Sequence, residues 1–321
     1  MENIYIVMLV VLFGLAITDL VVGVSNDAVN FLNSAIGSKA VSLRTIMIVA
    51  SVGVAVGAIF SSGLMEVARK GIFMPSQFYF DEIMIIFMAV MITDVLLLDF
   101  FNSLGLPTST TVSIVFELLG AAVSIAVIKL YSEGESLALL SEYINTAKAT
   151  EIVLGILLSV VVAFSIGAFV QYVSRLIFTF QYEKKLKYFG AIFGGVSFAA
   201  ITYFIFIKGM KSITFLPSEV KEFVNEHTWL IILISFVFWS LISQLLMSVF
   251  KTNILKAIII VGTFALALAF AGNDLVNFIG VPIAAWQSFG LWQTAYETSG
   301  VLPSEFAMNG LAGSVQTPEF L

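Results

Sequence analysis

The sequence is poor in the residues on which many enzymes and secreted domains depend. It contains no cysteine, which excludes disulfide bonds and thiolate metal sites and leaves the redox compartment open. His227 is the single histidine, so one chain cannot build a histidine metal site or a histidine proton relay. Only 11% of the residues are charged, against about 25% in a soluble domain. The net charge of −6 argues against nucleic acid as a partner.

Apolar residues take the place of the missing charge. Hydrophobic residues make up 60% of the 321 residues, and the mean hydropathy is +1.04. A membrane-spanning helix needs about 20 mostly apolar residues, and we identify eight candidate runs. Because these runs are continuous and backbone groups in lipid need internal partners, we predict an all-α polytopic integral membrane protein. The predicted spans are Ile4–Val24, Leu43–Leu64, Ile83–Phe101, Thr110–Leu130, Ile152–Arg175, Tyr188–Ile207, Trp229–Phe250 and Ile254–Ala271.

The direction of the spans follows from the basic residues in short loops. The densest cluster is Arg175 with Lys184, Lys185 and Lys187, which we expect on the cytoplasmic side. Counting back along the spans then places the N-terminus outside, in a chain expected in the cell (inner) membrane. The first apolar run lacks a basic start and is too long for a signal peptide, so we expect it to be retained.

One polar motif occurs twice in this apolar sequence. It reads SNDAVNF from Ser25 and GNDLVNF from Gly272. The predicted spans deliver the two copies from opposite sides of the membrane, which indicates an inverted-repeat secondary transporter with a central site. We therefore predict a first inverted repeat over residues 1–131, connecting spans and loops over 132–250, and the start of an incomplete second repeat over 251–321.

Two further segments, the one that begins at Asn26 and the tail from Gln287, are not predicted to cross the membrane. The stretch from Asn26 to Ser38 has about a dozen residues, too few to cross a bilayer. We predict a re-entrant or broken half-helix there, facing protein or a water-filled cavity. The polar tail from Gln287 carries no span signal, and we expect it to fold over the outer mouth or to be disordered.

A run of hydroxyl residues follows Pro107 in the segment LGLPTSTTVSIVFELLG. Proline disfavours helix at the residue before it, so the hydroxyls fall at the start of the next helix. Free N–H groups and the helix dipole at that position favour an anion. Ordinary capping or close helix packing is the alternative explanation, but the two Asn-Asp motifs favour an anion site. The hydroxyl residues are Thr108, Ser109, Thr110 and Thr111.

No lysine or arginine lies within these polar segments, so Asp27 and Asp274 would repel an anion unless a positive charge lies between. Carboxylate and amide oxygens are hard ligands for such a cation, or the carboxyl groups carry protons themselves. Cation and anion would then each favour binding of the other. Asp94 is an intramembrane acid, which by default predicts a functional role as a cation ligand or proton carrier. Glu117 is a second candidate.

These motifs resemble those of the inorganic phosphate transporter (PiT) family of cation-coupled symporters. The usual forms are G-A-N-D-V-A-N-A in each half and G-x-P-V-S-T-T-H-S, which here read VSNDAVNF, AGNDLVNF and GLPTSTTVS. Three departures stand out. Val54 occupies the position of a common glutamate, for which Glu117 is the candidate substitute. Val112 replaces the histidine after the threonine pair, and the chain reaches Leu321 without a second Pro-x-Ser-Thr-Thr segment.

The resemblance implies secondary active symport of inorganic phosphate, driven by a sodium or proton gradient, with no organic cofactor. It alone implies a homodimer. A carrier of sulfate or another oxyanion, an anion channel and an inactive relative are the alternatives. An intramembrane enzyme is disfavoured, because a catalytic aspartate pair needs no repeated amides. The candidate substrate-binding residues are Asn26, Asn30, Thr108, Ser109, Thr110, Thr111, Asn273 and Asn277. The candidate cation-binding residues are Asp27, Asp274, Asp94 and Glu117, with Asp27 and Asp274 as metal ligands if sodium is the driving ion.

Overall fold

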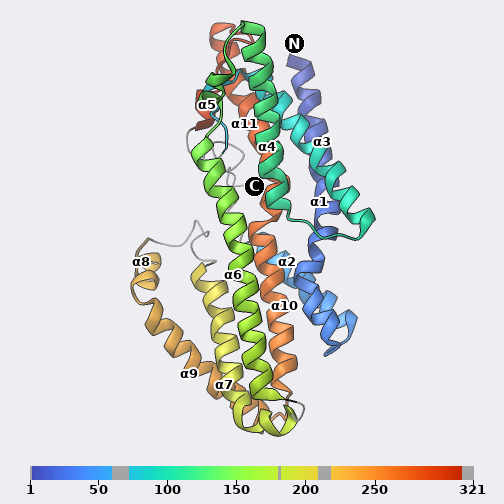
Figure 1. Ribbon diagram of the computed structural model, residues 1–321, viewed down its shortest axis with the longest axis vertical. Helices are drawn as coiled ribbons and strands as arrows, with labels where there is room; N and C mark the ends of the chain where they lie inside the picture. The colour runs from blue at the N-terminus through green and yellow to red at the C-terminus, as the bar shows by residue number, and fades with distance from the viewer. Residues whose placement is uncertain (1, 60–71, 180–181, 209–217, 313–321) are drawn as a thin grey trace. The chain divides into compact units, whose positions relative to one another are not determined.

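The computed structural model describes residues 2–59, 72–179, 182–208 and 218–312 (Figure 1). Within these ranges the chain is helical, and its only β-type pairings are two isolated bridges. The all-α prediction is therefore confirmed. The α-helices are α1 (Glu2–Ser38), α2 (Leu43–Ile59), α3 (Phe80–Leu104), α4 (Thr110–Glu133), α5 (Leu140–Tyr143), α6 (Thr146–Phe178), α7 (Tyr182–Thr202), α8 (Ser218–Glu226), α9 (Thr228–Ser248), α10 (Ile254–Asn273) and α11 (Leu275–Ser299).

Seven helical stretches in the described part are long and apolar enough to cross a membrane. They are α1, α3, α4, α6, α7 with its extension to Phe206, α9, and the stretch that α10 and α11 form together. The predicted span at Leu43–Leu64 corresponds to α2, which has only 17 described residues. The chain is an integral membrane protein, whereas the count of eight spans stays a prediction.

Two of the local predictions are wrong. The segment after Asn26 is no separate half-helix, because α1 continues through the motif to Ser38. This stretch has no glycine or proline before Gly37, so no residue in it interrupts the helical hydrogen bonds. The tail is also different from our expectation, since Gln287 lies inside α11 and the helix runs to Ser299. The chain does break at the second motif, where Asp274 separates α10 from α11.

The chain forms two compact units. The first combines residues 1–27, 64–157 and 274–321, and the second combines 28–63 and 158–273. Distant parts of the sequence thus build each unit.

An aromatic cluster joins three helices of the first unit. Phe80 of α3 stacks on Trp292 of α11, with ring centroids 4.9 Å apart and planes at 6°, and Tyr5 of α1 contacts both rings. Trp292 is 1% exposed. Burial of such large rings stabilises a fold strongly, which explains why the predicted tail is ordered helix up to this point.

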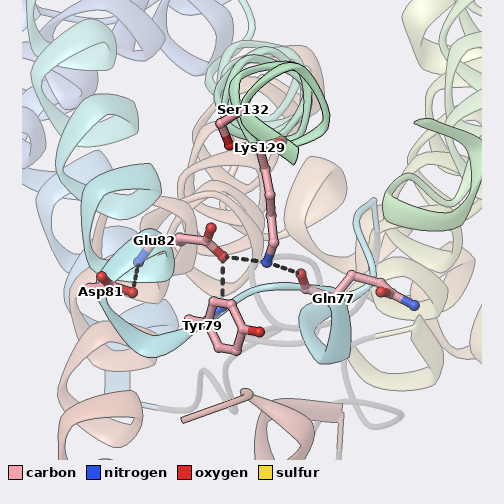
Figure 2. A network of polar contacts seen from close by, with 6 residues as sticks. All are labelled: Gln77, Tyr79, Asp81, Glu82, Lys129 and Ser132. Atoms are coloured by element: carbon pink, nitrogen blue, oxygen red, sulfur yellow. Dashed lines mark hydrogen bonds and ion pairs between the residues drawn. The ribbon is translucent and has the colours of Figure 1, made fainter. Parts of the chain in front are cut away.

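A polar network fixes the start of α3 in the same unit (Figure 2). Glu82 accepts a hydrogen bond from the Tyr79 backbone N–H at 2.8 Å and pairs with the Lys129 ammonium of α4 at 3.1 Å. The ammonium group also donates to the Gln77 carbonyl at 3.0 Å and lies 4.0 Å from the centre of the Tyr79 ring. These interactions of the Lys129 ammonium group are all favourable, so they hold α4 against the start of α3.

Close helix packing at glycine characterises the second unit. A side chain at Gly53 of α2 would lie 2.7 Å from the Phe264 carbonyl of α10, and one at Gly57 would overlap the Leu268 carbonyl. Gly194 of α7 packs in the same way against the Ser243 side chain of α9. Small residues allow helix backbones to approach closely in membranes, so these glycines position α2, α7, α9 and α10 within the unit.

Candidate functional site

The site begins at the turn between α3 and α4, where local sequence sets the backbone. Gly105 ends α3 with φ at 67°, in the left-handed region that favours glycine. Pro107 follows, and Ser109 is the N-cap of α4, with its hydroxyl accepting a bond from the Val112 N–H at 3.4 Å. The hydroxyl residues therefore lie at a helix N-terminus, as predicted.

Asn26 of α1 holds this turn in place. Its amide nitrogen donates to Asn102 Oδ1 at 2.9 Å and to the Leu106 carbonyl at 3.1 Å, and its oxygen accepts from the Thr108 N–H at 2.8 Å. Asn102 in turn donates to the Val22 carbonyl at 2.9 Å. Asn26 is 3% exposed and both ends of its amide are engaged, so the structure gives it a positioning role for the turn.

Two consecutive threonines of α4 bind the two motif aspartates. The Thr110 hydroxyl donates to Asp27 Oδ2 at 3.1 Å, and the Thr111 hydroxyl donates to Asp274 Oδ1 at 3.2 Å. Thr111 also accepts a bond from the Asn277 amide at 2.8 Å. These contacts lie within the first unit. We name this set of five residues the aspartate–threonine site.

Two helix N-termini meet at the aspartate–threonine site. Asp274 is the N-cap of α11, and Asn277 in the first turn of α11 reaches Thr111 in the first turn of α4. Gly23 of α1 makes this approach possible, because a side chain there would overlap the ring of Phe278. The start of a helix carries partial positive charge that favours an anion.

Burial differs across the site. Asp27 and Thr110 are 4% and 2% exposed, whereas Thr111 and Ser109 are exposed. The buried pair is therefore shielded from solvent, and the exposed hydroxyls remain accessible to a ligand. Asp27 and Asp274 each accept a bond from a true donor, so both are compatible with the ionised state.

A second group of polar residues lies further along α4. The Ser113 hydroxyl is 2.7 Å from Asp94 Oδ1 of α3 and 2.8 Å from Glu117 Oε1. Asp19 of α1 lies close enough to Asp94 and Glu117 to interact with both electrostatically. Asp19 and Asp94 are both 0% exposed. We name these four residues the carboxyl cluster. Among the described residues, no three His, Asp or Glu side chains are arranged to hold a metal ion.

A cleft of about 650 Å³ between α3 and α4 is lined by Ser113 and Glu117 of the carboxyl cluster and by Thr108 just before α4. Its walls are mostly apolar. The polar residues that line it are Thr93, Thr108, Ser113, Glu117 and Ser124. The cleft therefore connects the start of α4 with the edge of the carboxyl cluster.

The structure brings most of the predicted residues together. Asn30 falls in the second unit, where its side chain is exposed, and its role stays a prediction. Asn273 ends α10, and its side chain lies outside the described part of the structure. Sequence reasoning missed Asp19 and Asn102 as members of the two groups. Asp19 could have been found, because it lies two helical turns before Asn26 and is an acid in an apolar span.

Comparison with known proteins identifies the family. The sequence pattern of the phosphate transporter family matches residues 23–311. The chain belongs to this family. Members of the phosphate transporter family are transporters rather than enzymes.

Individual members of the phosphate transporter family are distant relatives of this chain. It is 26% identical over 266 residues to a candidate phosphate permease of Pyrococcus furiosus, and 26% identical over 270 residues to one of Thermococcus kodakarensis. The chain spans 61% and 62% of the lengths of these two relatives, and the alignments cover 81% of the chain itself. It also shares its fold with a solved sodium-dependent phosphate transporter, at a TM-score of 0.62 and 19% identity, over 95% of this chain and 72% of that one.

Proposed function

We propose that the protein is a secondary symporter of inorganic phosphate, with the aspartate–threonine site as its oxyanion site. The observation that carries the proposal is the pair of consecutive hydroxyls, Thr110 and Thr111, each bonded to a different motif aspartate at a helix N-terminus. In this structure the two hydroxyls donate to the aspartates. When a cation or a proton neutralises those carboxylates, the hydroxyls become available to donate to a tetrahedral oxyanion, together with the Asn277 amide. Family membership supports phosphate as the oxyanion.

The two aspartates make oxyanion binding conditional on a positive charge. The first unit's helices α1, α3 and α11 contain no lysine or arginine, and α4 contains only Lys129. Lys129 lies 18 residues beyond Thr111, at the other end of α4. A sodium ion ligated by Asp27 and Asp274, or a proton on one of them, would offset their repulsion of the oxyanion. Binding of cation and anion would then be coupled, which is the thermodynamic basis of symport.

Phosphate fits the site better than sulfate for a chemical reason. Near neutral pH phosphate carries a proton that it can donate to a carboxylate, whereas sulfate has none. Asp27 and Asp274 are acceptors of this kind, so they favour the protonated oxyanion. We also propose that the protein lies in the cell membrane with its N-terminus outside. We further propose that it forms a homodimer.

Uptake into proteoliposomes tests the proposal. The full chain should accumulate radiolabelled phosphate under an inward sodium or proton gradient, and excess sulfate should compete weakly. Thr111→Val removes the hydroxyl between Asp274 and Asn277 and should lower uptake by about tenfold or more. Thr294→Val is the matched control, because that exposed hydroxyl of α11 bonds only to the Gly290 carbonyl.

Two results would reject the proposal. Uptake that ignored both gradients would exclude symport, and current far faster than carrier turnover would indicate a channel. Full uptake by Thr111→Val, with Thr294→Val also unchanged, would remove the aspartate–threonine site from the mechanism.

A further inference from the structure

The carboxyl cluster has fewer hydrogen-bond donors than its geometry requires. Ser113 Oγ lies within hydrogen-bonding distance of both Asp94 and Glu117, at 2.7 and 2.8 Å. A hydroxyl has one proton to donate, and an ionised carboxylate can only accept. One of the two contacts therefore needs a proton that belongs to a carboxyl group.

Asp19 adds a second unmet requirement. Both of its carboxylate oxygens are buried and accept no hydrogen bond from a protein donor, and the same is true of Asp94 Oδ2 and Glu117 Oε2. Asp19 is 0% exposed and interacts electrostatically with Asp94 and Glu117. Neighbouring buried carboxylates repel one another, and a proton on one of them removes that repulsion.

Among the residues that the structure describes, no element packed against the carboxyl cluster supplies a basic partner. The titratable groups that face one another are Asp19 on α1, Asp94 on α3 and Glu117 on α4. The helix α11 packs against α3, but its only titratable residues are Tyr296 and Glu297 in its last turn. Lys129 lies on α4 about 18 Å beyond Glu117 at 1.5 Å per residue, and it is engaged by Glu82. Buried carboxylates without a counter-charge are strongly disfavoured.

We propose that Asp94 and Glu117, which both contact the Ser113 hydroxyl, form with the neighbouring Asp19 a proton-carrying site that couples proton movement to oxyanion transport. The coupling role rests on the proposed function. This site is separate from the aspartate–threonine site, whose two aspartates have true donors and are suited to an ionised state.

The order of proton movement follows from burial. Glu117 is the partly exposed member and lines the cleft between α3 and α4, whereas Asp19 and Asp94 are fully buried. A hydronium ion in the cleft gives its proton to a Glu117 oxygen and leaves as water. The proton then passes through the Ser113 hydroxyl, which gives its own proton to Asp94. Asp94 exchanges a proton with Asp19 directly, and each step forms one O–H bond as another breaks.

Infrared difference spectroscopy on the reconstituted full chain tests the site without requiring transport. The wild type should show the C=O stretch of a buried protonated carboxyl group, shifted in deuterium oxide and unaffected by sodium. Glu117→Gln and Asp94→Asn should each remove or shift this band. Asp99→Asn, an exposed aspartate on the same helix as Asp94, should leave it unchanged. A band that sodium abolishes would identify a sodium site instead, and a band absent from the wild type or unchanged in both cluster variants would also overturn the proposal.

Transport then tests the coupling. Proton-driven phosphate uptake should fall about tenfold or more in Glu117→Gln, while phosphate binding at equilibrium stays within about twofold of the wild type. Equal proton-driven uptake by Glu117→Gln and the wild type would overturn the coupling role. If the wild type takes up no phosphate under any gradient, the proposed function fails, and the infrared band still decides whether the cluster holds a proton.

Discussion

Lys129 and Asp94 show two opposite ways of placing charge in the first unit. At the start of α3, Lys129 pairs with Glu82, donates to a backbone carbonyl and lies over an aromatic ring (Figure 2). Further along the same two helices, Asp94 lies near Asp19, Ser113 and Glu117, and no described residue supplies it with a basic partner. The first arrangement satisfies each charge and the second leaves carboxyl oxygens unsatisfied.

The difference separates a stabilising role from a functional one. A charge that is removed from water costs free energy unless a partner compensates for it. Natural chains rarely keep an uncompensated intramembrane acid, and such acids line ion pathways and proton relays. We therefore expect substitutions at the Lys129 network to reduce stability and substitutions at the carboxyl cluster to reduce coupling.

The largest expected change in stability is at Lys129. The Lys129→Met variant leaves Glu82 without its counter-charge and should lower the free energy of unfolding by about 3 kcal/mol. Thermal unfolding in detergent micelles measures the loss. Ser132→Ala is the control, because this exposed hydroxyl contacts only the Lys129 carbonyl. The double variant Lys129→Met/Glu82→Gln should recover part of the loss, and a loss no larger than that of Ser132→Ala would contradict the interpretation.

Asp94→Asn should have a smaller effect of the opposite sign. The amide keeps the shape of the side chain, removes one buried acid and supplies N–H donors to Asp19 or Glu117. Stability should stay unchanged or rise by about 1 kcal/mol, even though proton coupling is lost. The same unfolding assay measures it. If Asp94→Asn destabilised the protein as much as Lys129→Met, the cluster would be a structural network.

Of the charged groups compared, Lys148 should contribute least to the stability of the protein. It pairs with Glu151 at 3.0 Å, but the two side chains are 44% and 70% exposed. Solvent screens such a pair, so Lys148→Ala should change stability by no more than about 0.5 kcal/mol. The effect should vanish in high salt. A loss comparable to that of Lys129→Met would show that burial does not govern the strength of these pairs.

The sequence indicated which residues meet in the site better than it indicated the course of the helices that carry them. The Asn-Asp motifs and the hydroxyls after Pro107 identified the residues that meet at the start of α4, because polar groups in apolar spans are rarely incidental. The course of α1 through Asn26 could not be predicted, since the same polar residues fit a helix or a re-entrant break. The helix at Gln287 could not be predicted either, because its stability depends on Trp292 packing against Tyr5 and Phe80, which are distant in sequence.

Which carboxyl groups lie close together could be determined only from the fold. Asp94 and Glu117 belong to different helices, and the Ser113 hydroxyl that both contact becomes apparent only when α3 and α4 pack together. Asp19 lies far from both in sequence. Its membership depends on α1 packing in the same unit, which no local pattern specifies.

The central claim is that Asp27 and Asp274 make oxyanion binding depend on a cation. The most direct measurement is equilibrium binding of phosphate to the purified full chain, with sodium replaced by choline and pH varied independently. The account predicts that sodium or acid strengthens binding by about tenfold or more, and that the Asp27→Asn/Asp274→Asn variant loses this dependence. Equal phosphate affinity in the wild type with and without either cation would contradict it.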